Sequence, residues 1–275
     1  MGMIKLNKVL KQIKKHSVIY GLFMKNSLMG YMEYRANLIA ALVMELVYLL
    51  SKLLYLVAVY QTGITINGTT PDEIMLFTGT YIIMTAVYTG LFMDNFYKLP
   101  EHIRNGTLDI YITKPISLQF ITTLRHVNFV LPIPNLIAGI TLVLTACRRL
   151  GITIDFISVS GYLLTLLSST FITYSVFLMP QILSFWTVRS GAITEIADRC
   201  WDFNNMPMSI YNKWMQRAGV FIIPVFFITN LPSLYLIRRL ENIYTLWLFV
   251  APVIFMLFVR GFWKHALKNY TSASS

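Results

Sequence analysis

Residues 102–115 read HIRNGTLDIYITKP, and this polar island between two long apolar runs decides how the whole chain is interpreted. A stretch with several charges, with Gly106 in its middle and Pro115 at its end, cannot cross hydrocarbon, because its charges and irregular backbone would lack water. If the flanking runs cross a membrane, the island must therefore be a loop or a short helix outside it.

Composition favours a membrane protein. Of the 275 residues, 56% are hydrophobic and 13% are charged, which lies outside the usual range for a soluble domain. The net charge of +11 would suggest nucleic-acid binding in a soluble chain. Here most lysines and arginines lie between or beyond the apolar runs, where orientation in the membrane explains them, so we expect no nucleic-acid partner.

The hydropathy pattern predicts an all-α integral membrane protein, with six transmembrane helices in a single domain over residues 37–263. Residues 1–36 form the N-terminal helix and lead-in, and residues 264–275 form a short cytosolic tail. The positive-inside rule places both termini and the island in the cytosol, the connection 62–73 outside, and 189–217 at the cytosolic interface. The predicted spans are residues 37–60, 74–93, 127–146, 157–186, 218–237 and 243–259.

The N-terminal segment has apolar residues at helical spacing and lysines on the remaining surface. This pattern predicts a basic amphipathic helix that lies on anionic headgroups, and contact with a cytosolic partner is a compatible second role. The apolar positions are Leu6, Val9, Leu10 and Ile13.

The first span carries two charged residues, Glu45 and Lys52, on nearly one helical face that Tyr48 and Tyr55 extend. Charges at this depth cost a few kcal/mol, so this face should contact other helices or a water-filled cavity rather than lipid. Two roles remain open for it, namely helix packing and the lining of a substrate pathway.

The predicted fifth span, residues 218–237, contains Pro224, Asn230 and Pro232 and could therefore be broken or re-entrant. Arg238 and Arg239 directly follow it on the predicted external side. Two arginines outside agree poorly with the positive-inside rule, which weakens the assignment of this region.

Several kinds of chemistry lack their sequence signals. The chain has no G-x-x-x-x-G-K-[ST], H-E-x-x-H or G-x-S-x-G motif, and its four histidines fall at or beyond the ends of the predicted spans. We therefore expect no catalytic residues, no bound cofactor and no metal. The pattern alone leaves a transporter or a receptor-like protein open, with an ion-coupled secondary transporter and a membrane-embedded lipid-modifying enzyme as alternatives.

The island resembles the G-x-L-D-x-x-L-x-[KR]-P pattern that follows the second helix in ABC-2 type permeases, specifically a compact family once catalogued as a domain of unknown function. The matching residues are Gly106-Thr107-Leu108-Asp109, Lys114-Pro115 and Gln119-Phe120. Together with the island, further similar segments cover nearly the whole chain in order. They are Met206-Pro207 with Ile210-Tyr211, Ile222-Ile223-Pro224-Val225 leading to Leu231-Pro232, and Tyr270-Thr271-Ser272-Ala273-Ser274-Ser275.

This resemblance implies the membrane subunit of an ATP-driven exporter, located in a bacterial cell membrane and surrounded by its lipids. A separate cytosolic ATP-binding subunit, as a dimer, would hold ATP and Mg²⁺ and dock on the island as a coupling helix between the second and third spans. The simpler alternative is that the island is only a solvated connector. The implied coupling residues are Glu101, Arg104, Asn105, Gly106, Leu108, Asp109, Lys114 and Pro115.

The resemblance also implies a second permease subunit, identical or paralogous, so that each subunit forms half of the pathway. A re-entrant segment between the fifth and sixth spans would form an external gate. Drugs, peptide antibiotics and lipid-linked cargo all remain open as substrates. The implied gate residues are Pro224, Asn230, Pro232 and Tyr235.

Overall fold

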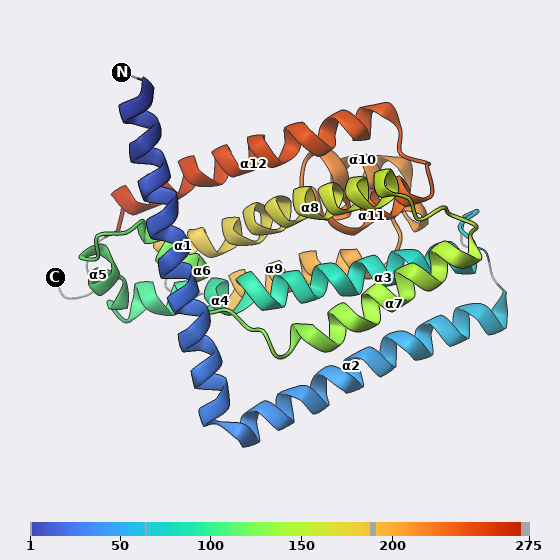
Figure 1. Ribbon diagram of the computed structural model, residues 1–275, viewed down its shortest axis with the longest axis horizontal. Helices are drawn as coiled ribbons and strands as arrows, with labels where there is room; N and C mark the ends of the chain where they lie inside the picture. Colours follow the sequence, from blue (N-terminus) through green and yellow to red (C-terminus); the bar gives the residue numbers. More distant parts are fainter. Residues whose placement is uncertain (1, 64, 66, 188–190, 271–275) are drawn as a thin grey trace.

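A computed structural model describes residues 2–63, 65, 67–187 and 191–270, and within these ranges all regular structure is helical. The side chains of Leu6 and Val9, and residues 271–275 of the predicted tail, lie outside the described part. The long helices run lengthwise through the molecule (Figure 1). They are α2 (Arg35–Thr62), α3 (Pro71–Tyr88), α7 (Pro132–Arg149), α8 (Phe156–Ile182) and α12 (Asn242–Lys268).

Helix α3 is the centre of the bundle and is buried along nearly its whole length. It begins at a capping box, in which the Thr70 side chain and Glu73 each accept a hydrogen bond from the other's backbone N–H, and Pro71 occupies the first turn. Its closest neighbour is α7: a Cβ on Gly79 would lie 2.9 Å from the Gly139 carbonyl oxygen. Small residues thus let the two backbones approach as helices do in membranes.

A π-helical turn, Thr89–Met93, joins α3 to α4 (Asp94–Arg104). The Gly90 carbonyl of this turn accepts a hydrogen bond of 2.8 Å from the backbone N–H of Asn128, in the connection that leads into α7. A π turn frees a carbonyl from the regular helical pattern, and here the freed group fixes the neighbouring connection.

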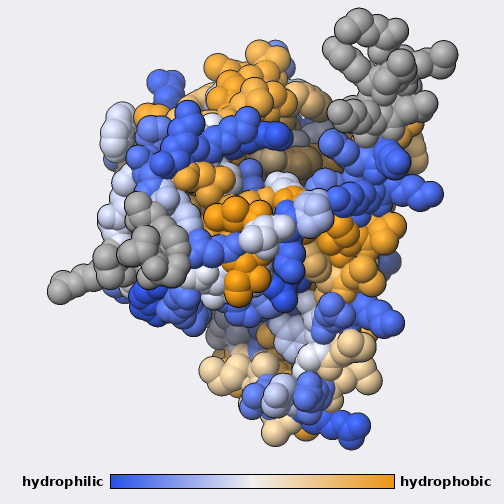
Figure 2. Space-filling model, turned by 90° about the vertical axis from the view of Figure 1, so that its left-hand side faces the viewer, coloured by the Kyte–Doolittle hydropathy of each residue, from blue (hydrophilic) through white to orange (hydrophobic). Residues whose placement is uncertain are grey.

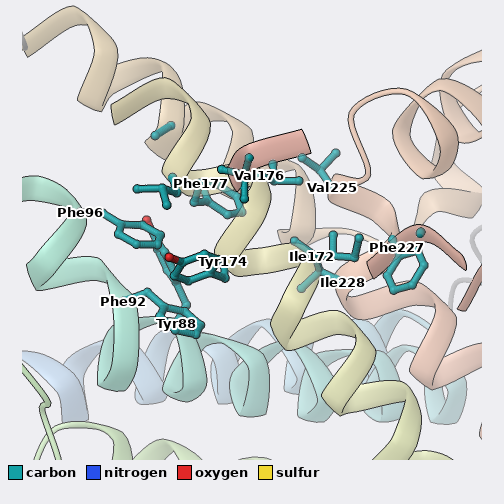
Figure 3. Close-up of a cluster of buried hydrophobic side chains, with 14 of the residues drawn as sticks. Tyr88, Phe92, Phe96, Ile172, Tyr174, Val176, Phe177, Val225, Phe227 and Ile228 are labelled. Carbon is teal, nitrogen blue, oxygen red and sulfur yellow. The ribbon is translucent and has the colours of Figure 1, made fainter. Parts of the chain in front are cut away.

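The short helix α9 (Gly191–Asp202) packs beside α8 (Figure 1) through Ile193 and Ala197, and most of its other side chains are exposed. Its Trp201 stacks on Tyr88 with ring centroids 4.5 Å apart. Around this contact, aromatic rings from α3, α4 and α8 fill the core. Figure 3 shows five of them converging: Tyr88, Phe92, Phe96, Tyr174 and Phe177.

Helices α10 (Lys213–Phe221) and α11 (Val225–Leu236) meet at a bend of 101°. Both outer ends of this pair lie beside the start of α3. Before α10, Ser209 accepts a 2.8 Å hydrogen bond from Asn67, and after α11, Arg239 lies 2.9 Å from the carboxylate of Glu73. The chain therefore enters and leaves this pair at one end of the bundle.

These contacts agree with one expectation and correct another. Residues 218–237 are broken, as their prolines indicated, because Ile222, Ile223 and Pro224 interrupt the helix. Residues 62–73 and 189–217 cannot lie wholly on opposite sides of a membrane, because Asn67 contacts Ser209. Arg189 itself falls outside the described residues. The error arose because 189–217 is rich in charges, and charged segments were assigned to the interface.

In the described part of the chain, four helical stretches are long and apolar enough to cross a membrane, and the bent pair would make a fifth. The four are Arg35–Thr62, Pro71–Arg104, Phe156–Phe185 and Asn242–Lys268, which contain four of the six predicted spans. Helix α7, with 18 residues, two prolines and a terminal Arg148–Arg149 pair, is not among them.

The N-terminal helix α1 (Gly2–Glu33) lies across one end of the lengthwise helices (Figure 1). It contacts the bundle through His16 and Phe23, whose rings lie 4.8 and 5.9 Å from the ring of Phe120 in α6 (Leu118–Leu124). Leu10 and Ile13, two residues of the predicted apolar stripe, are exposed. An exposed apolar stripe is the surface that an interface helix needs.

Candidate functional site

The island forms the end of α4, a turn and the six-residue helix α5 (Thr107–Ile112). Gly106 makes the turn with a φ of 69°, a left-handed conformation that favours glycine. The inner face of α5 is anchored by Leu108, which is fully buried, and by Tyr111. The island is therefore a defined structural element and not an open loop.

The outer face of α5 carries exposed apolar side chains. Ile110 is 59% exposed and Ile112 is 50% exposed. Figure 2, which looks at this end of the molecule, shows hydrophilic side chains over most of the surface with apolar groups between them. An apolar patch with a charged rim is typical of a protein contact. The predicted coupling residues that are exposed nearby are the polar Glu101, Arg104, Asn105 and Lys114, together with Pro115.

Three contacts hold the island against the rest of the chain. Arg125, at the end of α6, donates a 2.6 Å hydrogen bond to the hydroxyl of Tyr111. Lys15 of α1 donates to the carbonyl of Pro115 at 2.5 Å. At the chain's C-terminal side, burial and the carboxylate of Asp109 raise the pKa of Tyr270 to about 12. The island thus touches α1, α6 and the segment after α12.

The face of α2 that carries Glu45 and Lys52 is directed toward the other helices. Asn135 of α7 donates a hydrogen bond to Glu45, and Lys52 donates one of 2.6 Å to Asn205. Farther along the face, the hydroxyl of Tyr55 lies 3.7 Å from the sulfur of Met206. The face therefore contacts other helices, as expected, while its role in lining a pathway stays a prediction.

An aromatic cage around Lys52 is a feature that the sequence did not reveal. The ammonium group lies 5.3 Å from the ring centroid of Tyr48 and 4.7 Å from that of Tyr81. These distances allow cation–π attraction, which offsets part of the cost of a partly buried charge. Tyr81 and Asn205 are far from Lys52 in sequence, and no local spacing links the three.

The predicted gate residues lie in or next to α11. Pro224 precedes its first residue, and Pro232 is buried within it. The side-chain oxygen of Asn230 accepts a 2.7 Å hydrogen bond from the backbone N–H of Met208, and the Tyr235 hydroxyl donates to the carbonyl of Ile157 at 3.2 Å. These bonds tie α11 to the short 3-10 turn Met208–Ile210 and to the start of α8, and gating stays a prediction.

The sequence also did not reveal the ion pairs at the end of the bundle where α3 begins. Arg149 lies 3.8 Å from Asp72, and Arg239 lies 2.9 Å from Glu73, so the first turn of α3 pairs with two arginines from distant segments. Each pair places a carboxylate of α3 beside an arginine from a distant segment of the chain.

The helical architecture, with several long apolar helices, defines a multi-pass membrane protein. The family model described as "ABC-2 family transporter protein" matches residues 46–274. The chain therefore belongs to the ABC-2 transporter family and is a membrane permease, in agreement with the resemblance found in its sequence. Comparison with curated proteins and with solved structures gives no match.

Proposed function

We propose that this chain is the membrane subunit of an ATP-driven exporter and that α5 docks on a separate cytosolic ATP-binding subunit. The observation that carries this proposal is the two-sided character of α5. Its inner face is fixed by Leu108 and Tyr111, while Ile110 and Ile112 are exposed on the outside. An anchored element with an exposed apolar face can transmit a push from a partner to the helices behind it.

The contacts of α5 support this coupling role. Through Tyr111 the island is bonded to Arg125, and the next residue, His126, exchanges two backbone hydrogen bonds of 2.7 and 2.8 Å with the side chain of Asn95. Movement of α5 would therefore be passed to both α4 and the connection into α7. ATP and Mg²⁺ would act in the partner, and this chain would have no catalytic residues of its own.

We further propose six crossings, with α9 as the fifth and α10–α11 as a re-entrant segment on the external side. This arrangement is supported by the positions of the segments at the two ends of the bundle. Asn67, Ser209, Glu73 and Arg239 gather at one end of the bundle, and α5 and the C-terminal end of α12 lie at the other (Figure 1). Helix α9 then runs from the cytosolic end toward the external end, and both termini are cytosolic.

A second permease subunit is favoured by the exposed charges on α9. Glu195 and Arg199 form an ion pair of 3.7 Å, with 70% and 74% of their side chains exposed. On a crossing helix such charges should not face lipid. A water-filled space between two subunits, with α9 and the polar face of α2 on its walls, would accommodate them and form the transport pathway.

Purification of the complex from native membranes tests the proposal. We expect an ATP-binding subunit with a Walker A motif to copurify, and ATP hydrolysis to be required for transport in vesicles. Transport by the purified chain alone, driven by an ion gradient without ATP, would contradict it. For the second subunit, Ile196→Cys on α9 should cross-link two permeases once Cys147 and Cys200 are replaced by alanine.

A further inference from the structure

A cavity with both charged and apolar lining residues lies where α1, the start of α2 and α4 meet the connection into α7. Its volume is about 520 Å³, within the range of roughly 300–1,000 Å³ typical of small-molecule sites. The basic residues Lys98 and Arg125 line it, and Asp94 is its one acidic lining residue in the described chain. Uncharged hydrogen-bonding side chains complete the polar wall: Asn26, Ser27, Tyr31, Tyr34, Asn37 and His126.

The wall is held in position by the surrounding contacts. Asn95 binds the backbone of His126 in both directions, and the backbone N–H of Val127 donates to the Ser27 hydroxyl at 3.1 Å. On the opposite side, Tyr31 donates to Asp94 at 3.4 Å. The cavity is therefore formed before any ligand enters, which lowers the cost of ordering on binding.

Charge in the cavity favours an anion. Arg125 uses one nitrogen to bind Tyr111, which leaves its other N–H groups available. Among the described residues, Lys98 makes no hydrogen bond or ion pair. The pKa of His126 is lowered to about 4, first by burial and then by Lys98 and Arg125, as expected for a positive local potential. Two cations with several hydroxyl and amide donors suit a phosphate group.

The position of the cavity points to a lipid as the source of that phosphate. Leu38 and Ala41 extend the lining along α2, and the adjoining side chains of Ile39 and Val43 are exposed and apolar. Charged groups and an adjoining apolar helix in one cavity match a phospholipid, which has a charged head and hydrocarbon tails. The helix α1, with exposed apolar residues of its own, covers the chamber at the level expected for headgroups.

We propose that this cavity binds the phosphate of an anionic membrane phospholipid, with Lys98 and Arg125 as its ligands and the acyl chains along α2. The bound lipid would link α1 and α2 to α4, close to the island. The inference needs only the membrane location of the family, and it is independent of docking between α5 and an ATP-binding subunit.

Native mass spectrometry of the purified complex with phosphatidylglycerol tests this site. Lys98→Met should weaken lipid binding about tenfold, because it removes a charge-assisted contact. Asp94→Asn should strengthen binding, because it removes the negative charge from the wall. Lys264→Met, which removes an equal charge from an exposed position on α12, is the matched control and should leave binding unchanged.

The outcomes separate the alternatives. Equal binding by wild type and Lys98→Met would overturn the proposal, and so would an equal loss in Lys98→Met and Lys264→Met, which would indicate unspecific charge attraction. Displacement of the lipid by inorganic phosphate at millimolar concentration would assign the cavity to free phosphate instead. Retention of phosphatidylglycerol in the presence of phosphate, lost only in Lys98→Met, supports the lipid site.

Discussion

The two ends of the helix bundle satisfy their polar groups in different ways. At the end where α3 begins, both carboxylates of its first turn pair with arginines, Asp72 with Arg149 at 3.8 Å and Glu73 with Arg239 at 2.9 Å. At the end with α5, Glu101, Arg104 and Lys114 are exposed and form no ion pair within the described residues. A surface whose charges are satisfied internally contributes to folding, whereas one with unpaired charges around Ile110 and Ile112 is available to a partner.

The largest effect is expected from a substitution in the exposed apolar patch of α5. Ile110→Asp places a charge in the centre of the proposed docking patch and should weaken binding of the ATP-binding subunit by at least about 30-fold, as loss of an interface hot spot does. Because Ile110 is 59% exposed, the unfolding temperature of the permease should not change. Titration of the ATP-binding subunit onto permease in detergent measures the affinity.

Ile110→Leu keeps the apolar surface and serves as the control, with binding close to wild type. If Ile110→Asp bound the ATP-binding subunit normally, α5 would be only a solvated connector. The docking part of the proposed function would then fail, while family membership would stand.

The second prediction concerns the opposite end. Glu73→Ala removes the partner of Arg239 and one half of the capping box of α3. The Glu73 side chain is only 7% exposed, whereas that of Arg239 is 58% exposed and partly screened, so we expect a loss of about 2 kcal/mol in unfolding free energy. Denaturation in mild detergent measures it, and binding of the ATP-binding subunit should be retained.

Glu195→Ala is the matched control for this change. It removes a carboxylate from an ion pair whose two side chains are both largely exposed, so the loss should stay below about 0.5 kcal/mol. Equal losses in the two variants would show that the pairs at the α3 end are no more stabilising than surface pairs, and the contrast between the ends would disappear.

The sequence predicted those parts of the fold that depend only on the cost of placing a charge or an irregular backbone in hydrocarbon. The island was placed outside the bundle because charges and Gly106 cannot lie in hydrocarbon, and the face of α2 with Glu45 was turned inward for the same reason. In the structure α5 lies at one end, and Glu45 contacts Asn135. These predictions needed no knowledge of the partner residue.

The topology after α8 could not be read locally, because distant partners decide it. Helix α9 carries Asp198, and its charges led to a place at the cytosolic interface. In the structure Asp198 is exposed and accepts a hydrogen bond from Tyr97 of α4, a partner that no local signal links to it. The apolar run at 218–237 was long enough to cross, but Pro224 separates α10 from α11 and both ends return to α3.

A third prediction sharpens the role of the turn before α5. Gly106→Ala forces a side chain into a backbone with a φ of 69° and should cost about 1 kcal/mol of stability in the turn. The expected result is faster amide hydrogen exchange in residues 105–112, with weaker coupling of ATP hydrolysis to transport. Gly21→Ala in α1, where a Cβ meets nothing within 4 Å, should change neither.

The smallest expected effect is a pH dependence at His126, between the island and the lipid cavity. Burial, followed by the charges of Lys98 and Arg125, lowers the pKa of this histidine from 6.5 to about 4. As pH falls below about 6.5, the unfolded chain takes up a proton that the folded chain does not, so the unfolding free energy decreases until about pH 4 and then levels off. Because the ring is partly exposed, this loss should remain below about 1 kcal/mol.

Unfolding measured from pH 7.5 to 4, values that bracket this window, should show the loss in wild type and not in His126→Gln. Glutamine keeps the size and hydrogen-bonding character of the side chain without the titration, so the difference between the two curves isolates the histidine. Identical curves would mean that His126 is as accessible to protons in the folded protein as in the unfolded chain. Neither burial, the larger cause, nor the charges of Lys98 and Arg125 would then lower its pKa, and the support that this histidine gives to a positive potential beside the cavity would be lost.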